Sequence, residues 1–270
     1  MKIKVRLWVK ITITIIMLIV LLFVYGRYIN TTGFKVHEYT IKASIPDSFN
    51  GIKIVHISDI NYLYTTDKSG LKRIIDRINL INPDIVVFTG DLLNIHIEYK
   101  KEEIDTLTKL LSNISAKIGK FAVNGEEDTN FKEFNDILIN SNFTILDNNY
   151  ENIYNKTNES ILITGISDDI KEPDIISDTY NILLVHKPDY ITNIDYENYD
   201  LILAGHSLNG YINIPGIKNL LLDEGAKKYY NNYYKLDDTN MYISNGIGTK
   251  NIKFRIFNKP SINFYRIKKK

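Results

Sequence analysis

The chain has 270 residues, 44% of them hydrophobic and 24% charged, which is the composition of an ordinary globular protein and excludes a disordered or collagen-like chain. The formal net charge of +1 provides no general basic field, so the composition does not indicate a nucleic-acid partner. There is no cysteine, which excludes disulfides, thiolate metal ligands and cysteine nucleophiles.

A basic and strongly apolar segment opens the chain. Residues 1–27 hold five basic residues and no acidic one, so the remainder carries a net charge of −4. Residues 11–26 read ITITIIMLIVLLFVYG, without a charge. A helix of roughly 20 residues spans the hydrocarbon core of a bilayer, and Lys10 and Arg27 have side chains long enough to reach the two interfaces. We therefore predict a transmembrane anchor over residues 1–27 and a polar linker at 28–34.

A cleaved signal peptide has a similar basic start and apolar centre. We favour an uncleaved anchor because no small-residue cleavage site follows the apolar run, which continues as YGRYINTT. Basic residues precede the span, so the positive-inside rule predicts a cytoplasmic N-terminus. The chain is then a single-pass protein of the cell membrane, with an extracytoplasmic domain over residues 35–270.

Beyond the linker, short apolar runs alternate with helical patterns. Residues 69–82 place leucine and isoleucine at helical spacing, and residues 101–112 do the same. Strands that end at turn residues and alternate with helices of this length predict an α/β sheet. The runs expected to be strands are IKIVHI, DIVVFTG, KFAV, SILITGI, NILLVH and DLILAGH.

The last third of the sequence has a different character. From Tyr211 onward it consists mostly of short strand-like runs and turns, which favours an added antiparallel section packed in the same domain. These runs are YINIP, KNLLL, YYNNYYKL, NMYISNG, KFRIF and INFYRI.

Five of the predicted strands end in polar residues that are suited to bind a metal. Ligands of α/β proteins gather at the carboxyl ends of strands, and carboxylates with imidazoles suit Mn, Fe or Zn. Each residue alone is more often a turn, cap or structural residue, but their order and spacing together are more specific. In chain order they are Asp59 and Asn61, then Asp91, then Glu126, Glu127 and Asp128, then His186, then His206.

In these residues the chain resembles the calcineurin-like metallophosphoesterases. The motif blocks of that family are D-x-H, G-D, G-N-H-[D/E], a histidine after a strand, and G-H-x-H. Here SDIN, TGDLL, NGEED, VHKP and GHSL stand in that order, and flanking stretches such as GIKIVHISDI and PDIVVFTGDLL look like the membrane-anchored bacterial branch. The resemblance covers residues 35–270 and implies a four-layer α/β/β/α sandwich behind the transmembrane helix.

The resemblance also implies a pair of metals bridged by Asp91. The first metal site of the family corresponds to Asp59, Asn61 and Leu208 in this chain. Leucine cannot bind a cation, and the amide of asparagine is a weak, neutral substitute for imidazole. We therefore expect this site, degenerate at Asn61 and Leu208, to be vacant or loosely occupied.

The second metal site implied by the resemblance keeps a full set of ligands. It corresponds to Asp91, Glu126, His186 and His206, which is a sound set for one divalent ion, Mn, Fe or Zn. The remaining histidines do not replace the lost ligands. His56, for example, lies on the strand before Asp59 and is expected to point to the opposite face.

Asp91 and Glu127 are the candidate catalytic residues. Glu127 replaces the G-N-H histidine, which in the family assists the leaving group, and an ionised carboxylate there repels a phosphate. The resemblance implies a metal-dependent hydrolase of phosphoesters or pyrophosphates, and the anchored branch suggests lipid or envelope precursors as substrates. The alternative is a catalytically impaired pseudo-phosphoesterase that serves as a binding or scaffold module at the membrane surface. The usual two-metal activity is not expected, and the sequence leaves open whether one metal gives weak turnover or none.

Overall fold

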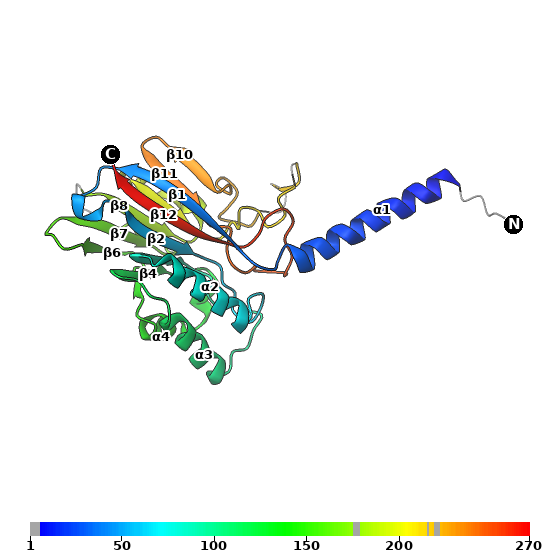
Figure 1. The fold of residues 1–270 in the computed structure, drawn as a ribbon, viewed down its shortest axis with the longest axis horizontal. Coiled ribbons are helices and arrows are strands. Elements are labelled where there is room, and N and C mark those ends of the chain that lie inside the picture. Colours follow the sequence, from blue (N-terminus) through cyan, green and yellow to red (C-terminus); the bar gives the residue numbers. More distant parts are fainter. Residues whose placement is uncertain (1–5, 175–178, 215, 219–221) are drawn as a thin grey trace.

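The anchor predicted from the sequence is a single projecting helix. The computed structural model describes residues 6–174, 179–214, 216–218 and 222–270. Helix α1 (Leu7–Val24) continues as a π-helical turn (Tyr25–Ile29) and extends away from the remaining chain (Figure 1). By length and composition the 23-residue stretch Leu7–Ile29 is a candidate membrane span. The expected apolar helix is therefore present at the N-terminal end.

The part of the chain that the structure describes contains two six-stranded sheets. Within each sheet most neighbouring strands are parallel, and three neighbouring pairs among the described strands are antiparallel. The first sheet has the order β1 (Lys35–Ala43), β12 (Ser261–Lys269), β2 (Ile52–Ile57), β3 (Ile85–Thr89), β4 (Gly119–Val123) and β5 (Thr144–Ile145). The second has the order β10 (Tyr233–Leu236), β11 (Thr239–Ile243), β9 (Leu201–Ala204), β8 (Asn181–Val185), β7 (Ser160–Ile166) and β6 (Asn149–Tyr154).

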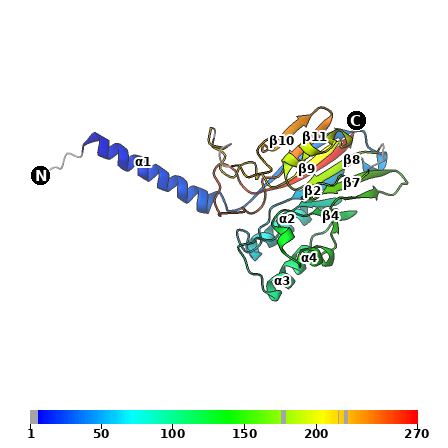
Figure 2. The ribbon, with the colours of Figure 1, turned by 180° about the vertical axis from the view of Figure 1, so that it is seen from behind.

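Three helices cover the outer face of the first sheet: α2 (Lys68–Ile81), α3 (Lys101–Ser112) and α4 (Phe134–Asn140) (Figures 1 and 2). Helix α2 begins where the side chain of Asp67 accepts a hydrogen bond from the Gly70 amide and ends at Asn82 in a left-handed conformation. Its apolar stripe, which includes Ile74 and Ile78, is buried against the sheet. The predictions for residues 69–82 and 101–112 are confirmed, whereas α4 was not predicted.

The two sheets pack face to face. Isoleucines, leucines and valines from both sheets interdigitate, as with Ile54 and Val87 of the first sheet and Ile163 and Leu184 of the second. Among the described residues, the outer face of the second sheet is covered by short 3-10 helices (Pro188–Asn193 and Tyr196–Asn198) and loops. The predicted sandwich is confirmed, with a thin fourth layer in place of long helices.

The last third of the chain is only partly an antiparallel addition. The hairpin β10–β11 is antiparallel, but β11 pairs in parallel with β9, and β12 lies between β1 and β2. The predicted strands at 211–215 and 253–257 were wrong for the described residues, which form loops joined by one bridge between Ile212 and Ile256. The second of these loops also bonds to the anchor, because the Arg255 amide donates to the carbonyl of Gly26 at the end of the anchor. The run KNLLL at 218–222 falls mostly outside the described residues.

Candidate metal centre

The loops that follow β2, β3, β8 and β9 meet at one edge of the sandwich. The amide of Asp59 donates to the carbonyl of Gly90 at 2.8 Å, which joins the loops of β2 and β3. The amide of His206 donates to the Asp59 carboxylate at 3.1 Å, which ties the second sheet to the first. Polar residues from four separate strand ends are thereby brought together, as the sequence predicted.

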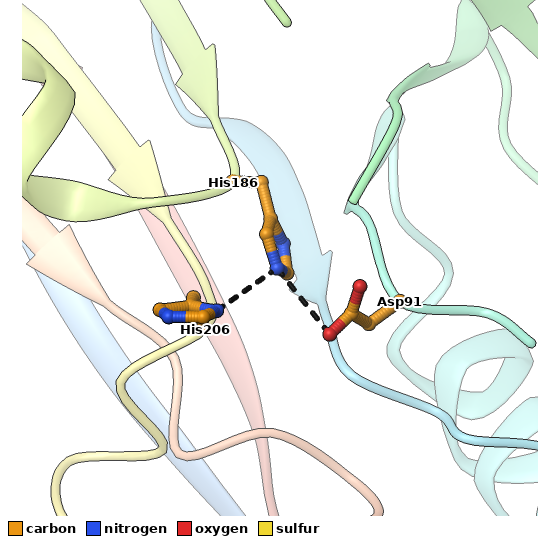
Figure 3. Close-up of side chains that lie close together, drawn as sticks. All are labelled: Asp91, His186 and His206. Carbon is orange, nitrogen blue, oxygen red and sulfur yellow. Dashed lines mark hydrogen bonds and ion pairs between the residues drawn. The ribbon is translucent and has the colours of Figure 1, made fainter. Parts of the chain in front are cut away.

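Asp91, His186 and His206 form a compact buried group at this edge (Figure 3). His186 Nε2 lies 3.4 Å from Asp91 Oδ2 and 3.3 Å from His206 Nδ1. One potential ligand atom of each residue lies within 4.8 Å of those of the other two. Three of the four residues predicted for the second metal site are therefore adjacent and share a common centre.

Backbone carbonyls fix the proton on each imidazole. His186 Nδ1 lies 2.6 Å from the carbonyl oxygen of Thr89, and His206 Nε2 lies 2.7 Å from that of Glu224. Because a carbonyl only accepts hydrogen bonds, each of these nitrogens must be the one that carries hydrogen. In the neutral rings His186 Nε2 and His206 Nδ1 then hold free lone pairs, which point toward each other and toward Asp91. This is how proteins orient metal-binding histidines.

The carboxylate of Asp91 fits the same purpose. Its Oδ1 accepts a hydrogen bond from the Glu127 amide at 3.1 Å. Its buried Oδ2 receives no hydrogen bond in the described part of the chain and faces the imidazole of His186. An anionic oxygen without a donor beside two converging lone pairs is costly unless a cation lies among them. The residues present therefore fit a divalent metal ion.

The titration of the group also indicates an affinity for positive charge. Burial lowers the pKa of the His186 imidazole, but the Asp91 carboxylate more than offsets this and raises it to about 10. Burial raises the pKa of Asp91, but His186 opposes it and brings it to about 2. Burial, together with the neighbouring His186, lowers the pKa of His206. The buried Asp91 carboxylate therefore favours a positive charge beside it.

Comparison with known families identifies the family of this chain. The model of the family described as calcineurin-like phosphoesterase matches residues 52–210 of the chain. The chain belongs to the calcineurin-like phosphoesterase family. It is 29% identical, over 90% of its own length and 89% of the other protein, to YkuE of Bacillus subtilis, named as an uncharacterized metallophosphoesterase.

More distant relatives of this calcineurin-like phosphoesterase have more specific names. A transmembrane protein with a metallophosphoesterase domain from Danio rerio is 24% identical over 93% of this chain, which spans 61% of that protein. LpxG of Chlamydia trachomatis, named as a UDP-2,3-diacylglucosamine pyrophosphatase, is 24% identical over 75% of this chain and 77% of that protein. Membership of the family implies binding of divalent metal, which agrees with the group at Asp91.

Asp128 positions the loop that carries Asp91 in this phosphoesterase. Its buried carboxyl group accepts hydrogen bonds from the amides of Asp91, Leu92, Leu93 and Gly125, at 2.7 to 3.1 Å. Burial, with the nearby Asp91 carboxylate, raises the pKa of Asp128 to about 8. The sequence predicts that Asp128 lies at the carboxyl ends of the strands, but it does not indicate a role. Only the folded loop shows which amides converge on this side chain.

The residues that the resemblance assigns to the first metal site, Asp59, Asn61 and Leu208, contact other protein atoms. Asn61 Oδ1 accepts a hydrogen bond from Asn94 at 2.6 Å, and Asp59 Oδ2 accepts from the hydroxyl of Ser58 at 2.5 Å. The side chains of Leu208 and Asp59 both lie against Gly246. Asp59 lies beside the group of Asp91, His186 and His206, and its role as a metal ligand stays a prediction. Asp59, Asn61, Asp91, His206 and Leu208 all have a left-handed backbone, with φ between 48° and 60°.

Glu126 and Glu127 occupy the rim of the centre. The Glu126 carboxylate forms ion pairs with Lys187, at 2.6 Å, and with Lys250. Glu127 is buried, accepts a hydrogen bond from the Ile95 amide at 2.9 Å, and has a pKa raised by burial. The position of Glu126 among the metal ligands stays a prediction. The sequence patterns did not indicate the two lysines as neighbours of the site, although Lys187 directly follows His186 in the sequence.

Arg255 is a further buried residue that the sequence did not reveal. Its guanidinium donates to the carbonyls of Gly246 at 3.2 Å and Gly248 at 2.6 Å. The Gly248 amide in turn donates to the carbonyl of Asp59 at 2.6 Å, so the arginine supports the loop behind the degenerate site. Burial lowers the pKa of Arg255 to about 10, and the charge of Asp59 opposes the shift. Arg255 thus places a positive charge near Asp59.

Proposed function

We propose that this calcineurin-like phosphoesterase is a membrane-anchored hydrolase of phosphoesters or pyrophosphates that works with one divalent ion bound by Asp91, His186 and His206. The observation that supports this most strongly is the orientation of the two imidazoles. Their outer nitrogens donate to backbone carbonyls, so their inner nitrogens present lone pairs to one point beside Asp91. Mn, Fe and Zn are the ions that suit this ligand set.

The metal would polarise a phosphoryl oxygen and lower the pKa of an attacking water. Around it, Glu126 is the proposed fourth ligand, and Asp59 is the remaining carboxylate of the weakened site. Glu127 is the proposed proton donor to the leaving group. Its own backbone amide bonds to Asp91, so its carboxyl group is held close to the proposed metal ligands. Lys187 and Lys250 place positive charge at the rim, where an anionic phosphate has to enter.

We further propose a location and a class of substrate. The N-terminus is cytoplasmic, α1 crosses the cell membrane once and the domain is extracytoplasmic, as the basic residues before the apolar run predict. The substrate is a lipid or an envelope precursor with a phosphoester or pyrophosphate bond. The name of the LpxG relative, which describes hydrolysis of a diacylated sugar nucleotide, supports this class.

A catalytically impaired binding module is the second candidate. It is favoured by the loss of imidazole at Asn61 and Leu208 and by the negative charge of Glu126 and Glu127 beside the centre. In that case the metal serves the structure only, and the domain binds a partner at the membrane surface.

Counting bound metal is the first experiment. The full chain is purified in detergent and analysed for metal by elemental analysis after loading with Mn and with Zn. We expect about one equivalent per chain, from a single complete ligand set. Two equivalents would contradict the loss of the first site, and no bound metal would contradict the hydrolase.

Hydrolysis is measured on the same preparation with a chromogenic phosphodiester and with a pyrophosphate-linked sugar nucleotide, each with Mn. Turnover that disappears in Asp91→Ala and persists in Asp76→Ala, an exposed carboxylate on α2, supports the enzyme. A metal-loaded chain without turnover on either substrate favours the binding module. A reporter fused to the C-terminus tests the orientation, and a cytoplasmic signal would contradict it.

A further inference from the structure

The end of the anchor helix packs tightly against one loop of the domain, residues 249–258, which we call the anchor loop. The carbonyl of Gly26 accepts a hydrogen bond from the Arg255 amide at 3.0 Å, and the side-chain amide of Asn30 donates to the carbonyl of Asn258 at 3.3 Å. A Cβ atom on Gly26 would lie 2.6 Å from the ring of Phe254, so a larger residue would have to displace that ring. Residues 28–34, predicted to be a linker, thus begin with a segment packed on the domain.

The contact reaches into the apolar span itself. The rings of Phe23 and Phe254 lie 5.7 Å apart, and those of Tyr25 and Phe257 lie 5.9 Å apart. Phe23 precedes Arg27 by four residues, which is about 6 Å along a helix. If Arg27 lies at the interface, the Phe254 ring lies at the edge of the hydrocarbon core. The anchor loop is therefore held at the depth of the lipid headgroups.

The surface of the anchor loop suits that depth. Ile252 and Phe257 are 54% and 61% exposed, which is unusual for large apolar side chains in a loop. The loop contains Lys253, Lys259 directly follows it, and there is no acidic residue between Glu224 and the C-terminus outside Asp237 and Asp238. Apolar side chains flanked by lysines are typical of surfaces that insert at the boundary of an anionic bilayer.

The same loop is bonded to the loops beside the metal centre. Besides the bonds from Arg255 to the loop behind Asp59, the side-chain amide of Asn258 donates to the carbonyls of Leu208 and Gly210. Figures 1 and 2 show α1 meeting the domain at the end where these loops gather. The position of the anchor loop therefore fixes the orientation of the metal centre relative to α1.

We infer that the domain docks on the bilayer through the anchor loop, with Ile252 and Phe257 inserted among anionic lipids and the metal centre held next to the membrane surface. The inference rests on the proposed transmembrane anchor. It gives the domain a second membrane contact, so that it does not swing freely on a linker. A phosphoester at the level of the lipid headgroups then reaches the metal centre without leaving the membrane.

Single-cysteine labelling tests this docking, because the chain has no cysteine to remove. The full chain is reconstituted in vesicles of phosphatidylethanolamine and phosphatidylglycerol and labelled with an environment-sensitive fluorophore. The variants Phe257→Cys and Ile252→Cys report on the anchor loop. Ile139→Cys and Leu80→Cys, which replace exposed apolar residues on or near α4 and α2, are matched controls, and Ile16→Cys reports on the anchor.

We expect a blue-shifted emission and strong quenching by spin-labelled lipids at positions 257 and 252, and neither effect at 139 and 80. Quenching at position 16 with none at 257 and 252 overturns the docking and leaves the anchor intact. No quenching at position 16 overturns the anchor, and the docking with it. Neither readout depends on hydrolysis, so a failure of the proposed activity is seen separately.

The lysines provide a second test. Lys253→Gln combined with Lys259→Gln is expected to reduce the quenching at position 257 in vesicles that contain phosphatidylglycerol. The same two changes at Lys72 and Lys109, on α2 and α3, are expected to have no effect. Equal quenching in both double variants contradicts the selection of anionic lipid.

Discussion

His186 Nε2 and His206 Nδ1 face each other at 3.3 Å, and the opposite nitrogen of each ring lies within 2.7 Å of a backbone carbonyl. Two lone pairs at this distance repel each other unless a positive charge lies between or beside them. The nearby Asp91 oxygen adds negative charge to the same place. The arrangement is stable with a bound cation, and less so with a single proton in its place.

Removal of metal should therefore destabilise the protein. With free metal about 100-fold above its dissociation constant, binding stabilises the folded state by about 2.7 kcal/mol, so a chelator is expected to lower the melting temperature. Asp91→Asn and His206→Gln should melt at the same temperature with and without chelator, whereas Asp76→Asn should behave as the natural chain. A chelator effect that survives in Asp91→Asn places the metal elsewhere.

Lys250 is expected to weaken metal binding by holding Glu126. Its ammonium forms an ion pair with the Glu126 carboxylate and lies 3.5 Å from that of Glu127. Lys250→Met should raise the affinity for Mn, measured by calorimetry, because Glu126 is then free to bind the ion.

The variant Glu126→Gln separates the two explanations of such a gain. If Glu126 is a ligand, Lys250→Met gives no gain in the Glu126→Gln background. An equal gain in both backgrounds means that the lysine acts only through its charge, and that Glu126 is not a ligand.

The degenerate site should be recoverable. Asn61 and Leu208 already have the left-handed backbone shared by Asp59 and His206, and histidine tolerates this conformation better than leucine does. Asn61→His combined with Leu208→His is expected to raise the bound metal from about one to about two equivalents per chain. If the count does not change in a folded double variant, the packing of Leu208 against Gly246, and not the ligand type, excludes the second ion.

His56 should make the protein sensitive to acid. The ring is fully buried, Nε2 lies 2.8 Å from the Thr89 hydroxyl, and burial lowers its pKa to about 3. Between this value and the unfolded value of about 6.5 the unfolded chain binds the extra proton, so stability rises with pH and is lost as the pH falls. The loss amounts to about 1.4 kcal/mol for each pH unit in that window.

The pH dependence is measured by urea unfolding at several values between pH 4 and 7. His56→Gln should flatten it, and His96→Gln, at an exposed position, should leave it as in the natural chain. Parallel profiles for the natural chain and His56→Gln would show that other groups cause the acid sensitivity.

Arg255 should contribute to stability far more than an exposed arginine does. Arg255→Met leaves the carbonyls of Gly246 and Gly248 without their donor, and a loss of about 2–3 kcal/mol in the free energy of unfolding is expected. Arg266→Met removes a 3.8 Å contact with the exposed Glu38 and a cation–π contact with the Phe264 ring, and should cost about 1 kcal/mol or less. Similar losses in both variants would mean that the bonds to the loop contribute little.

Local patterns were sufficient to predict the core of the fold. The runs that became β2, β3 and β8 end in turn residues, and each is short and mostly apolar. Since parallel strands align their carboxyl ends, the convergence of Asp91, His186 and His206 followed from the order of the strands.

Features that depend on distant partners were not predictable in this way. The alternating run KFRIF has the pattern of a strand, but its backbone bonds to Gly26 of the anchor and its arginine bonds to residues 246 and 248. The ion pairs of Glu126 similarly join residues from three loops. Nothing in the neighbouring sequence specifies such partners, because charge pairs form wherever the fold brings the side chains together.

The parallel pairing of β1 with β12 has a practical consequence for handling the protein. Strand β1 starts next to the anchor and both strands run away from it, so the C-terminus emerges at the opposite end of the domain (Figure 1). Nine residues of extended strand cover about 30 Å. An affinity handle or a fluorescent protein fused behind Lys270 is thus kept apart from both the lipid and the metal centre. Immobilisation through that end leaves the α1 side of the domain, which we propose faces the membrane, open to vesicles and substrates.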